Sequence, residues 1–236
     1  MYADAGEAGG AFVPSFRPVR TYVPGTPARD PVRARVEAQR RARTKLRRYC
    51  AAHRLNRLAS LTYRGEGCHD PVQLRRDVGQ FFRSLRAFLG GRPFPYVWVP
   101  EWHKTDHGLH VHFAVGRFVP RRLIDAAWNR GWVHIKLLSD LPVGFTSLDE
   151  ARKAAGYLSK YVTKSFGDDE SARLAGLHRY EVAQGFQPVA QRFVGQSRGH
   201  VLDQACDAMG RRPSISWFSD DVEDWKAPPA MWFAWD

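Results

Sequence analysis

The middle of the chain contains three residues of the types that most often bind divalent metal ions. His110 and His112 are two positions apart, so on a β-strand their side chains would share one face. If the β-prone runs on either side of Thr105 and Asp106 form a hairpin, Glu101 lies opposite His110 on the neighbouring strand. Two imidazoles and one carboxylate would then converge, a ligand set that suits Mg²⁺ or Mn²⁺ and that also accommodates Zn²⁺.

The same predicted hairpin contains His103 and His107, which are alternative ligands but whose positions are more typical of exposed turn residues. The HVH run by itself is equally compatible with an ordinary strand in which one ring is buried against a neighbour. The pattern therefore predicts a metal site, with a purely structural role for the histidines as the alternative.

A second group of reactive side chains lies in the run GYLSKYVTK, which contains Tyr157, Lys160, Tyr161 and Lys164. On a helix the two tyrosines would lie together on the flank of an apolar stripe, with the lysines one step further out. A phenol has a pKa of about 10, so it acts as a nucleophile only where nearby positive charge stabilises the phenolate. The alternative is that both tyrosines pack their rings at the boundary of the core and expose their hydroxyls.

Positive charge is concentrated in one part of the chain. The net charge is +12, and residues 29–57 contain eleven basic residues against two acidic ones, whereas residues 167–236 are net negative. This distribution indicates a polyanionic partner, with nucleic acid the leading candidate, although a solvated arginine-rich helix has the same pattern. The candidate DNA-binding residues are Arg40, Arg41, Arg43, Lys45, Arg47 and Arg48.

Composition excludes several classes of protein. A hydrophobic content of 44% with 25% charged residues is ordinary for a folded chain, so disorder throughout is excluded. No stretch approaches the roughly 18 apolar residues of a membrane-spanning helix, and the first residues lack a signal-peptide pattern, which predicts a cytoplasmic protein with no membrane partner. Cys50, Cys68 and Cys206 are widely spaced, which predicts reduced thiols.

Hydrophobic periodicity predicts a mixed fold around these residues. Asp70 followed by Pro71 begins the clearest helix, and Ser147 with Glu150 predicts a capping box at the start of another. The predicted elements are a basic helix at about 30–53, a strand at 57–63, a helix at 71–89, strands at 96–103 and 108–115, a helix at 121–129, a strand at 132–138 and a helix at 147–164. This order predicts an α+β fold, in which an antiparallel sheet carries helices on one face, as in ferredoxin-like or RRM-like domains.

Three regions follow from these patterns. Residues 1–28 are rich in Gly, Pro and Ala, which predicts a flexible leader. Residues 29–166 would form the main domain, including the basic helix. Residues 167–236 would form a small C-terminal extension, with a helix near 201–209 and a strand near 214–218.

Three segments together resemble the motifs of rolling-circle replication initiators, the HUH endonucleases. They are LASLTY at 58–63, EWHKTDHGLHVHF at 101–113 and YLSKYVTK at 157–164, in the order and spacing of that family. The chain most resembles replication proteins of actinobacterial plasmids and related mobile elements, and the likeness includes HRYEVAQGFQP at 178–188.

The resemblance implies the HUH endonuclease fold and a metal-dependent DNA nickase. In this family a tyrosine attacks a phosphodiester in a single-stranded or hairpin origin, becomes linked to the 5′ phosphate and leaves a 3′-hydroxyl that primes synthesis. The phosphotyrosyl link keeps the phosphodiester energy, so strands can also be rejoined. The chain has no GxxxxGK[ST] motif, so a separate host helicase is implied, together with a host polymerase.

The likeness also implies roles for single residues, with Mg²⁺ or Mn²⁺ as the cofactor. The positions that match the family's metal ligands are Glu101, His110 and His112, and those that match its catalytic tyrosines and the following lysines are Tyr157, Lys160, Tyr161 and Lys164. Two tyrosines imply nucleophiles that alternate between initiation and termination. We predict that Tyr161 is the principal one, because it also aligns with the sole tyrosine of one-tyrosine relatives.

Other functions are compatible with the same residues. A relaxase or a single-strand transposase of the same superfamily would use all of them, a non-catalytic nucleic-acid-binding module would use the sheet and its aromatic residues, and a small zinc hydrolase would use only the metal ligands. Ser60 and Thr62 of the first strand are predicted to be structural. The candidate base-stacking residues are Trp98, Trp102, Trp128 and Trp132, although large aromatic residues more often belong to the core.

Overall fold

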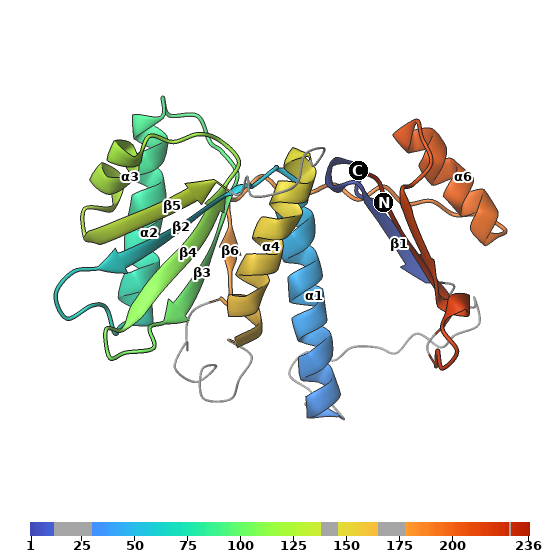
Figure 1. The fold of residues 1–236 in the computed structure, drawn as a ribbon, viewed down its shortest axis with the longest axis horizontal. Helices are drawn as coiled ribbons and strands as arrows, with labels where there is room; N and C mark the ends of the chain where they lie inside the picture. The colour runs from blue at the N-terminus through green and yellow to red at the C-terminus, as the bar shows by residue number, and fades with distance from the viewer. Residues whose placement is uncertain (12–29, 138–145, 165–177, 227) are drawn as a thin grey trace. The chain divides into compact units, whose positions relative to one another are not determined.

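The computed structural model describes residues 1–11, 30–137, 146–164, 178–226 and 228–236, without the side chains of Leu137, Thr163 and Lys164. The chain divides into two compact units (Figure 1), one of residues 37–187 and one of residues 1–36 together with 188–236. Within these described ranges, no helix combines the length and the hydropathy that are needed to cross a bilayer.

The larger unit is built on a five-stranded antiparallel sheet. Its strands are β2 (Arg57–Tyr63), β3 (Tyr96–Trp102), β4 (Leu109–Val115), β5 (Gly131–Leu137) and β6 (Glu181–Val182). They lie in the order β5-β2-β4-β3-β6, and the helices α2 (Pro71–Phe88) and α3 (Arg121–Trp128) connect them as β2-α2-β3-β4-α3-β5. This connectivity and strand order are ferredoxin-like, which confirms the predicted α+β fold class.

One face of the sheet packs against α2 and α3 (Figure 1). Helix α2 begins where the sequence predicts, because the Asp70 carboxylate accepts a hydrogen bond from the Val72 backbone N–H at 2.8 Å and Pro71 occupies the first helical position. The buried residues of this core include Leu74, Val78, Phe81, Phe82 and Leu85 of α2, Ile124 and Trp128 of α3, and Leu61, Val111 and Phe113 of the sheet.

The opposite face also carries helices, in addition to those predicted on the first face. Helix α4 (Ser147–Lys164) packs over β3 and β4, and the C-terminal part of α1 (Pro31–Ala52) packs into the same cluster (Figure 1). The buried residues of this second core are Leu58, Val97, Val99 and Ala114 of the sheet, Ala154, Ala155, Leu158 and Val162 of α4, and Leu46, Tyr49, Cys50 and Leu55 in and after α1. Strands with apolar residues on both faces must be covered on both faces.

Helix α4 is capped one residue earlier than the predicted box. The Asp149 carboxylate accepts hydrogen bonds from the backbone N–H of Thr146, at 2.9 Å, and from its hydroxyl, at 2.8 Å. Glu150 is thereby available to accept a hydrogen bond from the Asn56 side chain at 2.6 Å. This contact ties the start of α4 to the residue that precedes β2.

The smaller unit contains a second antiparallel sheet, in the order β1-β8-β7. Its elements are η1 (Ala3–Ala5), β1 (Glu7–Ala11), α6 (Arg198–Met209), β7 (Ile215–Phe218), η2 (Ser219–Asp221) and β8 (Ala230–Ala234). Ala8, Ala205, Phe233 and Trp235 form its buried core. The helix and strand near 201–209 and 214–218 therefore correspond to α6 and β7.

The prediction of a flexible leader is wrong for its first residues. Strand β1 pairs with β8 along its whole length, and the amino group of Met1 donates a hydrogen bond to the Gln191 carbonyl at 2.6 Å. The run EAGGA has no apolar alternation, so only its distant partner strand reveals it as a strand. Residues 12–28 of the predicted leader lie outside the described residues.

A buried ion pair near the start of α2 allows a test of the fold. Asp77 is 5% exposed, accepts a hydrogen bond from the Tyr63 hydroxyl at 3.0 Å and pairs with Arg130 at 2.9 Å. We expect Asp77→Ala to lower the free energy of unfolding by about 3 kcal/mol, because both partners lose their acceptor. Urea denaturation measures this change.

Asp125→Ala is the matched control, since Asp125 pairs with Arg121 on the exposed side of α3 at 3.5 Å. It should cost less than about 1 kcal/mol. Equal losses in the two variants would contradict the role assigned to Asp77.

Candidate active site

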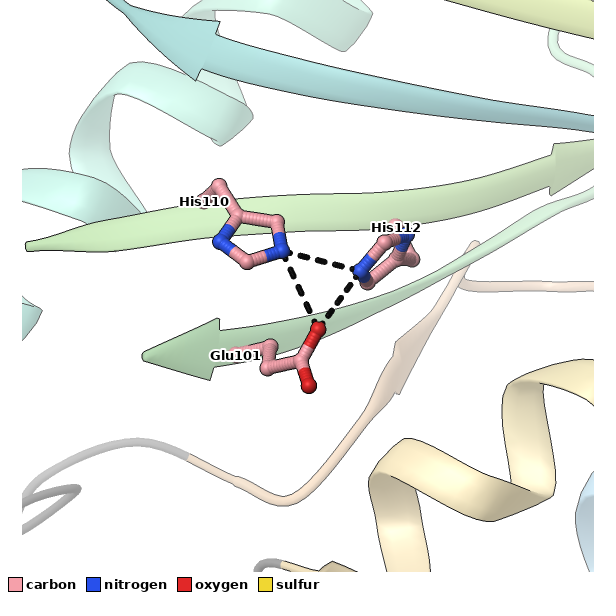
Figure 2. Close-up of side chains that lie close together, drawn as sticks. All are labelled: Glu101, His110 and His112. Atoms are coloured by element: carbon pink, nitrogen blue, oxygen red, sulfur yellow. Dashed lines mark hydrogen bonds and ion pairs between the residues drawn. The ribbon is translucent and has the colours of Figure 1, made fainter. Parts of the chain in front are cut away.

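Three side chains on β3 and β4 meet at one point, as Figure 2 shows. The Oε2 atom of Glu101 lies 3.0 Å from Nε2 of His110 and 2.9 Å from Nε2 of His112, and the two nitrogens are 3.0 Å apart. Glu101 and His112 are buried, with 8% and 7% exposed. The sequence predicted this convergence, and the cluster formed by these three residues is called the triad below.

The register of the β3–β4 hairpin positions the triad. Glu101 lies directly opposite His110, as the sequence predicted. The loop that joins the strands returns at Gly108, whose φ is +76° and where a Cβ atom would lie 2.2 Å from the Cys68 carbonyl oxygen. Only glycine combines this φ with such a close approach, so Gly108 allows the Leu109 N–H to donate to Cys68 O at 2.6 Å. The start of β4 is thereby fixed.

The three triad atoms cannot satisfy one another through hydrogen bonds. A carboxylate oxygen only accepts, and each neutral imidazole nitrogen either donates or accepts. Around a closed triangle, at least one contact must therefore join two donors or two acceptors. A divalent cation removes this conflict, because all three lone pairs can point at it. The donor set therefore fits a metal ion, and two imidazoles with one carboxylate suit Mn²⁺, Mg²⁺ or Zn²⁺.

Ser60 of β2 contacts the triad directly, although the sequence predicts only a structural role for it. It lies opposite His112 on β4, and its hydroxyl is 2.9 Å from His112 Nδ1. A proton on Nδ1 that is donated to Ser60 leaves the Nε2 lone pair facing the triad centre. Its place on the same face of strand 57–63 as Leu58 was visible in the sequence, but its pairing with β4 was not.

The two other histidines of the hairpin have different partners. His107 donates from Nε2 to the Tyr63 carbonyl at 2.8 Å, and His103 Nδ1 lies 2.7 Å from the Thr105 hydroxyl. The ring centre of His103 is 5.4 Å from that of His110. Among the residues that the structure describes, the only group with ligand atoms placed for a metal ion is the triad.

Both candidate nucleophiles lie against the triad. The ring of Tyr161 stacks on His112, with centres 3.9 Å apart and planes 11° apart, and the Tyr157 ring centre is 6.3 Å from that of His112. The Tyr161 hydroxyl donates a hydrogen bond to the Tyr157 hydroxyl at 2.9 Å. Tyr161 is half-buried and Tyr157 is 42% exposed, so a long substrate can reach the pair from solvent.

The surroundings of Tyr161 disfavour its phenolate. Burial raises the pKa of Tyr161 above its ordinary value, and the hydrogen bond to Tyr157 and the negative charge of Glu101 raise it further. Ionisation of this phenol therefore requires added positive charge. Lys160 supplies one charge at the edge of the site, with Nζ 5.6 Å from the centre of the Tyr157 ring. The side chain of Lys164 lies outside the described residues.

The predicted DNA-binding residues all lie on α1. The helix buries Leu46, Tyr49 and Cys50 in the second core and turns its basic residues outward. Arg40, Arg41, Arg43 and Lys45 are exposed, whereas Arg47 and Arg48 are half-buried. Arg40 pairs with Glu37 at 2.9 Å.

The four candidate stacking residues have different environments. Trp98 and Trp128 belong to the core, and Trp102 is half-buried. Trp132, at the start of β5, is 63% exposed. Of the four, Trp132 alone has a ring open to a flat ligand.

The range that contains all of these site residues can be compared with known families. Residues 56–166 match the family model of the replication-associated protein ORF2. The match includes the triad, both tyrosines and Ser60, and it supports a role as a replication initiator that binds DNA. No curated protein and no solved structure matches the chain.

The contact between Ser60 and His112 predicts an effect on metal affinity. We expect Ser60→Ala to weaken Mn²⁺ binding by about 10- to 100-fold, because His112 loses the group that holds its ring orientation and its tautomer. Isothermal titration calorimetry measures the affinity. Thr62→Ala is the control, since the Thr62 hydroxyl bonds to the Trp132 carbonyl at 3.3 Å. Unchanged affinity in Ser60→Ala would show that Ser60 does not hold the ligand.

Proposed function

We propose that the protein is a rolling-circle replication initiator of the HUH endonuclease type, which nicks and rejoins single-stranded DNA through a 5′-phosphotyrosyl intermediate. The observation that carries this proposal is the stacking of Tyr161 on His112 at 3.9 Å, because it places a nucleophile beside a metal-ligand cluster. The match of residues 56–166 to a replication-associated family supports the same conclusion.

Glu101, His110 and His112 would hold Mg²⁺ or Mn²⁺. When bound, the cation supplies a Lewis acid for a non-bridging oxygen of the scissile phosphate. The triad residues then fix the position of that phosphate relative to the two phenols, which lie on the side of His112. Ser60 keeps the His112 ring in the orientation that this arrangement requires.

The tyrosine pair provides the covalent step. The Tyr161 oxygen forms a bond to phosphorus, the bond between phosphorus and the 3′ oxygen breaks, and the 3′ oxygen takes up a proton to become a free hydroxyl. The Tyr161 proton moves along its 2.9 Å hydrogen bond to the Tyr157 oxygen, and the exposed Tyr157 passes its own proton to solvent. Lys160 lowers the energy of negative charge on this pair.

The basic residues of α1 would contact DNA phosphates at the origin, which makes binding dependent on salt concentration. A separate host helicase would unwind the duplex, and a host polymerase would extend the 3′-hydroxyl. The proposed place of action is the cytoplasm, where these partners are present.

The formation of a covalent adduct tests this function. The purified protein is incubated with Mn²⁺ and labelled single-stranded DNA from the region flanking its gene, and a denaturing gel is examined for a protease-sensitive adduct. We expect the adduct to disappear with EDTA and in His110→Ala, His112→Ala and the Tyr157→Phe, Tyr161→Phe double variant, because each lacks the metal site or the nucleophiles.

Two variants serve as controls for these losses. His69→Ala, in the neighbouring loop, and Tyr180→Phe, in the second core, should form the adduct at the wild-type rate. Intact DNA binding with no adduct anywhere in the flanking region would instead favour a non-catalytic binding module. Turnover of a small ester with bound zinc would favour a hydrolase.

The two tyrosines can be separated by single substitutions. We expect Tyr161→Phe to abolish the first cleavage, because it removes the phenol that lies on His112, and Tyr157→Phe to form the adduct but lose transfer to a second strand. Adduct formation and strand joining are measured on one gel. Cleavage by Tyr161→Phe at the wild-type rate would assign the first step to Tyr157.

A further inference from the structure

A small pocket opens beside the triad, on the side away from Glu101. Its volume is about 190 Å³, and its lining includes Leu58 and Ser60 of β2, His112 of β4, His134 and Lys136 of β5, and Tyr157 of α4. Two of these residues, His112 and Tyr157, also belong to the candidate active site. Whatever occupies the pocket therefore lies next to the reacting group.

Sheet register explains how the pocket forms. Ser60 lies between its two cross-strand partners, His112 and His134, and Leu58 is paired with Lys136. Neighbouring strands are about 4.8 Å apart, so the pocket floor extends roughly 10 Å from the triad to β5. Helix α4 packs over β3 and β4, and within the described residues it leaves the same face of β5 uncovered.

The chemistry of this surface matches a single-stranded polynucleotide. Leu58 and the Tyr157 ring provide apolar and aromatic surface for a planar base, while His134 and Lys136 provide exposed hydrogen-bond donors for a phosphate. Trp132 lies on the same face of β5, two residues before His134, and is 63% exposed. An exposed indole beside a cation is the arrangement that binds unpaired bases.

The size of the pocket restricts the occupant further. A volume of about 190 Å³ is below the roughly 300–1,000 Å³ of pockets for drug-sized ligands, so it accommodates one unpaired heterocycle and excludes a base pair. A duplex would also keep its bases stacked inside, away from Trp132.

We propose that this pocket binds the unpaired base next to the scissile phosphate, that Lys136 and His134 contact the backbone phosphate of that nucleotide, and that Trp132 stacks on the following base. The placement of the nucleotide relative to the cleaved bond rests on the proposed nicking function. The single-strand preference of the pocket rests on its own residues.

Fluorescence anisotropy tests the proposal with the full chain, a labelled single-stranded 12-mer that spans the mapped nick site, and EDTA to prevent cleavage. We expect Trp132→Ala and Lys136→Ala each to raise the Kd by about tenfold. The salt dependence separates the two roles: Lys136→Ala should reduce the slope of log Kd against log salt by about one, whereas Trp132→Ala should leave the slope unchanged.

Two controls make the test specific. Trp225→Ala removes a 37% exposed indole from the smaller unit and should not change the Kd. The duplex form of the same oligonucleotide should be bound equally by the wild type and by Trp132→Ala. All four side chains chosen are exposed, and circular dichroism verifies that each variant is folded.

An abasic 12-mer locates the base that enters the pocket. Removal of the base next to the scissile phosphate should weaken binding to the wild type, and His134→Ala with Lys136→Ala should bind the intact and abasic strands with a smaller difference. Equal discrimination by this double variant would overturn the pocket assignment.

The failures of the two proposals are distinguishable. If the adduct forms but the Trp132 and Lys136 variants keep wild-type Kd values, the pocket proposal is overturned and the nicking function stands. If no adduct forms but the Kd and salt-slope pattern is found, the surface is supported as a single-strand site and its placement beside a cleaved bond is overturned.

Discussion

The antiparallel pairing of β3 with β4 determines where the metal ligands lie. In register, Glu101 faces His110 and His112 lies one pair further along, so three ligand atoms come within 3.0 Å of one another. A slip of one residue would turn both histidines to the other face of the sheet, into the core that now contains Val111 and Phe113. The apolar residues that alternate with the histidines therefore protect the site, because their burial holds the register.

The face that carries the triad is divided into two halves. Toward one end of the strands, Leu58, Val97 and Ala114 pack against α4 and α1. Toward the other end, polar side chains replace them. Helix α4 has to serve both halves: its alanines and Leu158 hold it on the apolar half, and Tyr157 and Tyr161 extend over the polar half. The position of the phenols is thus a consequence of apolar packing at the other end of the helix.

The polar half explains why the active site and the proposed nucleotide pocket share residues. Cross-strand rows on a sheet bring neighbouring side chains within contact distance, and the row from His134 through Ser60 to His112 joins strands β5, β2 and β4. One end of the row faces the tyrosines and the other is open at the sheet edge. A strand of DNA that lies along this row would reach the metal ligands and an exposed indole at once.

The sequence by itself determined the parts of the site that local geometry controls. The triad is formed within one hairpin, and Tyr157 and Tyr161 are one helical turn apart, so period-two and period-3.6 reasoning was sufficient for both. The order of strands and helices likewise favoured the α+β fold that the structure shows. The positions of the nucleophiles relative to the metal ligands rested on family resemblance alone.

Only the tertiary structure decided the contacts between distant segments. Ser60 and His112, Tyr161 and His112, and Lys136 beside Tyr157 are brought together by strand order and by the packing of α4, and β1 becomes a strand only through β8. No local pattern determines such pairs, because each contact depends on the burial of apolar residues elsewhere in the two segments that it joins.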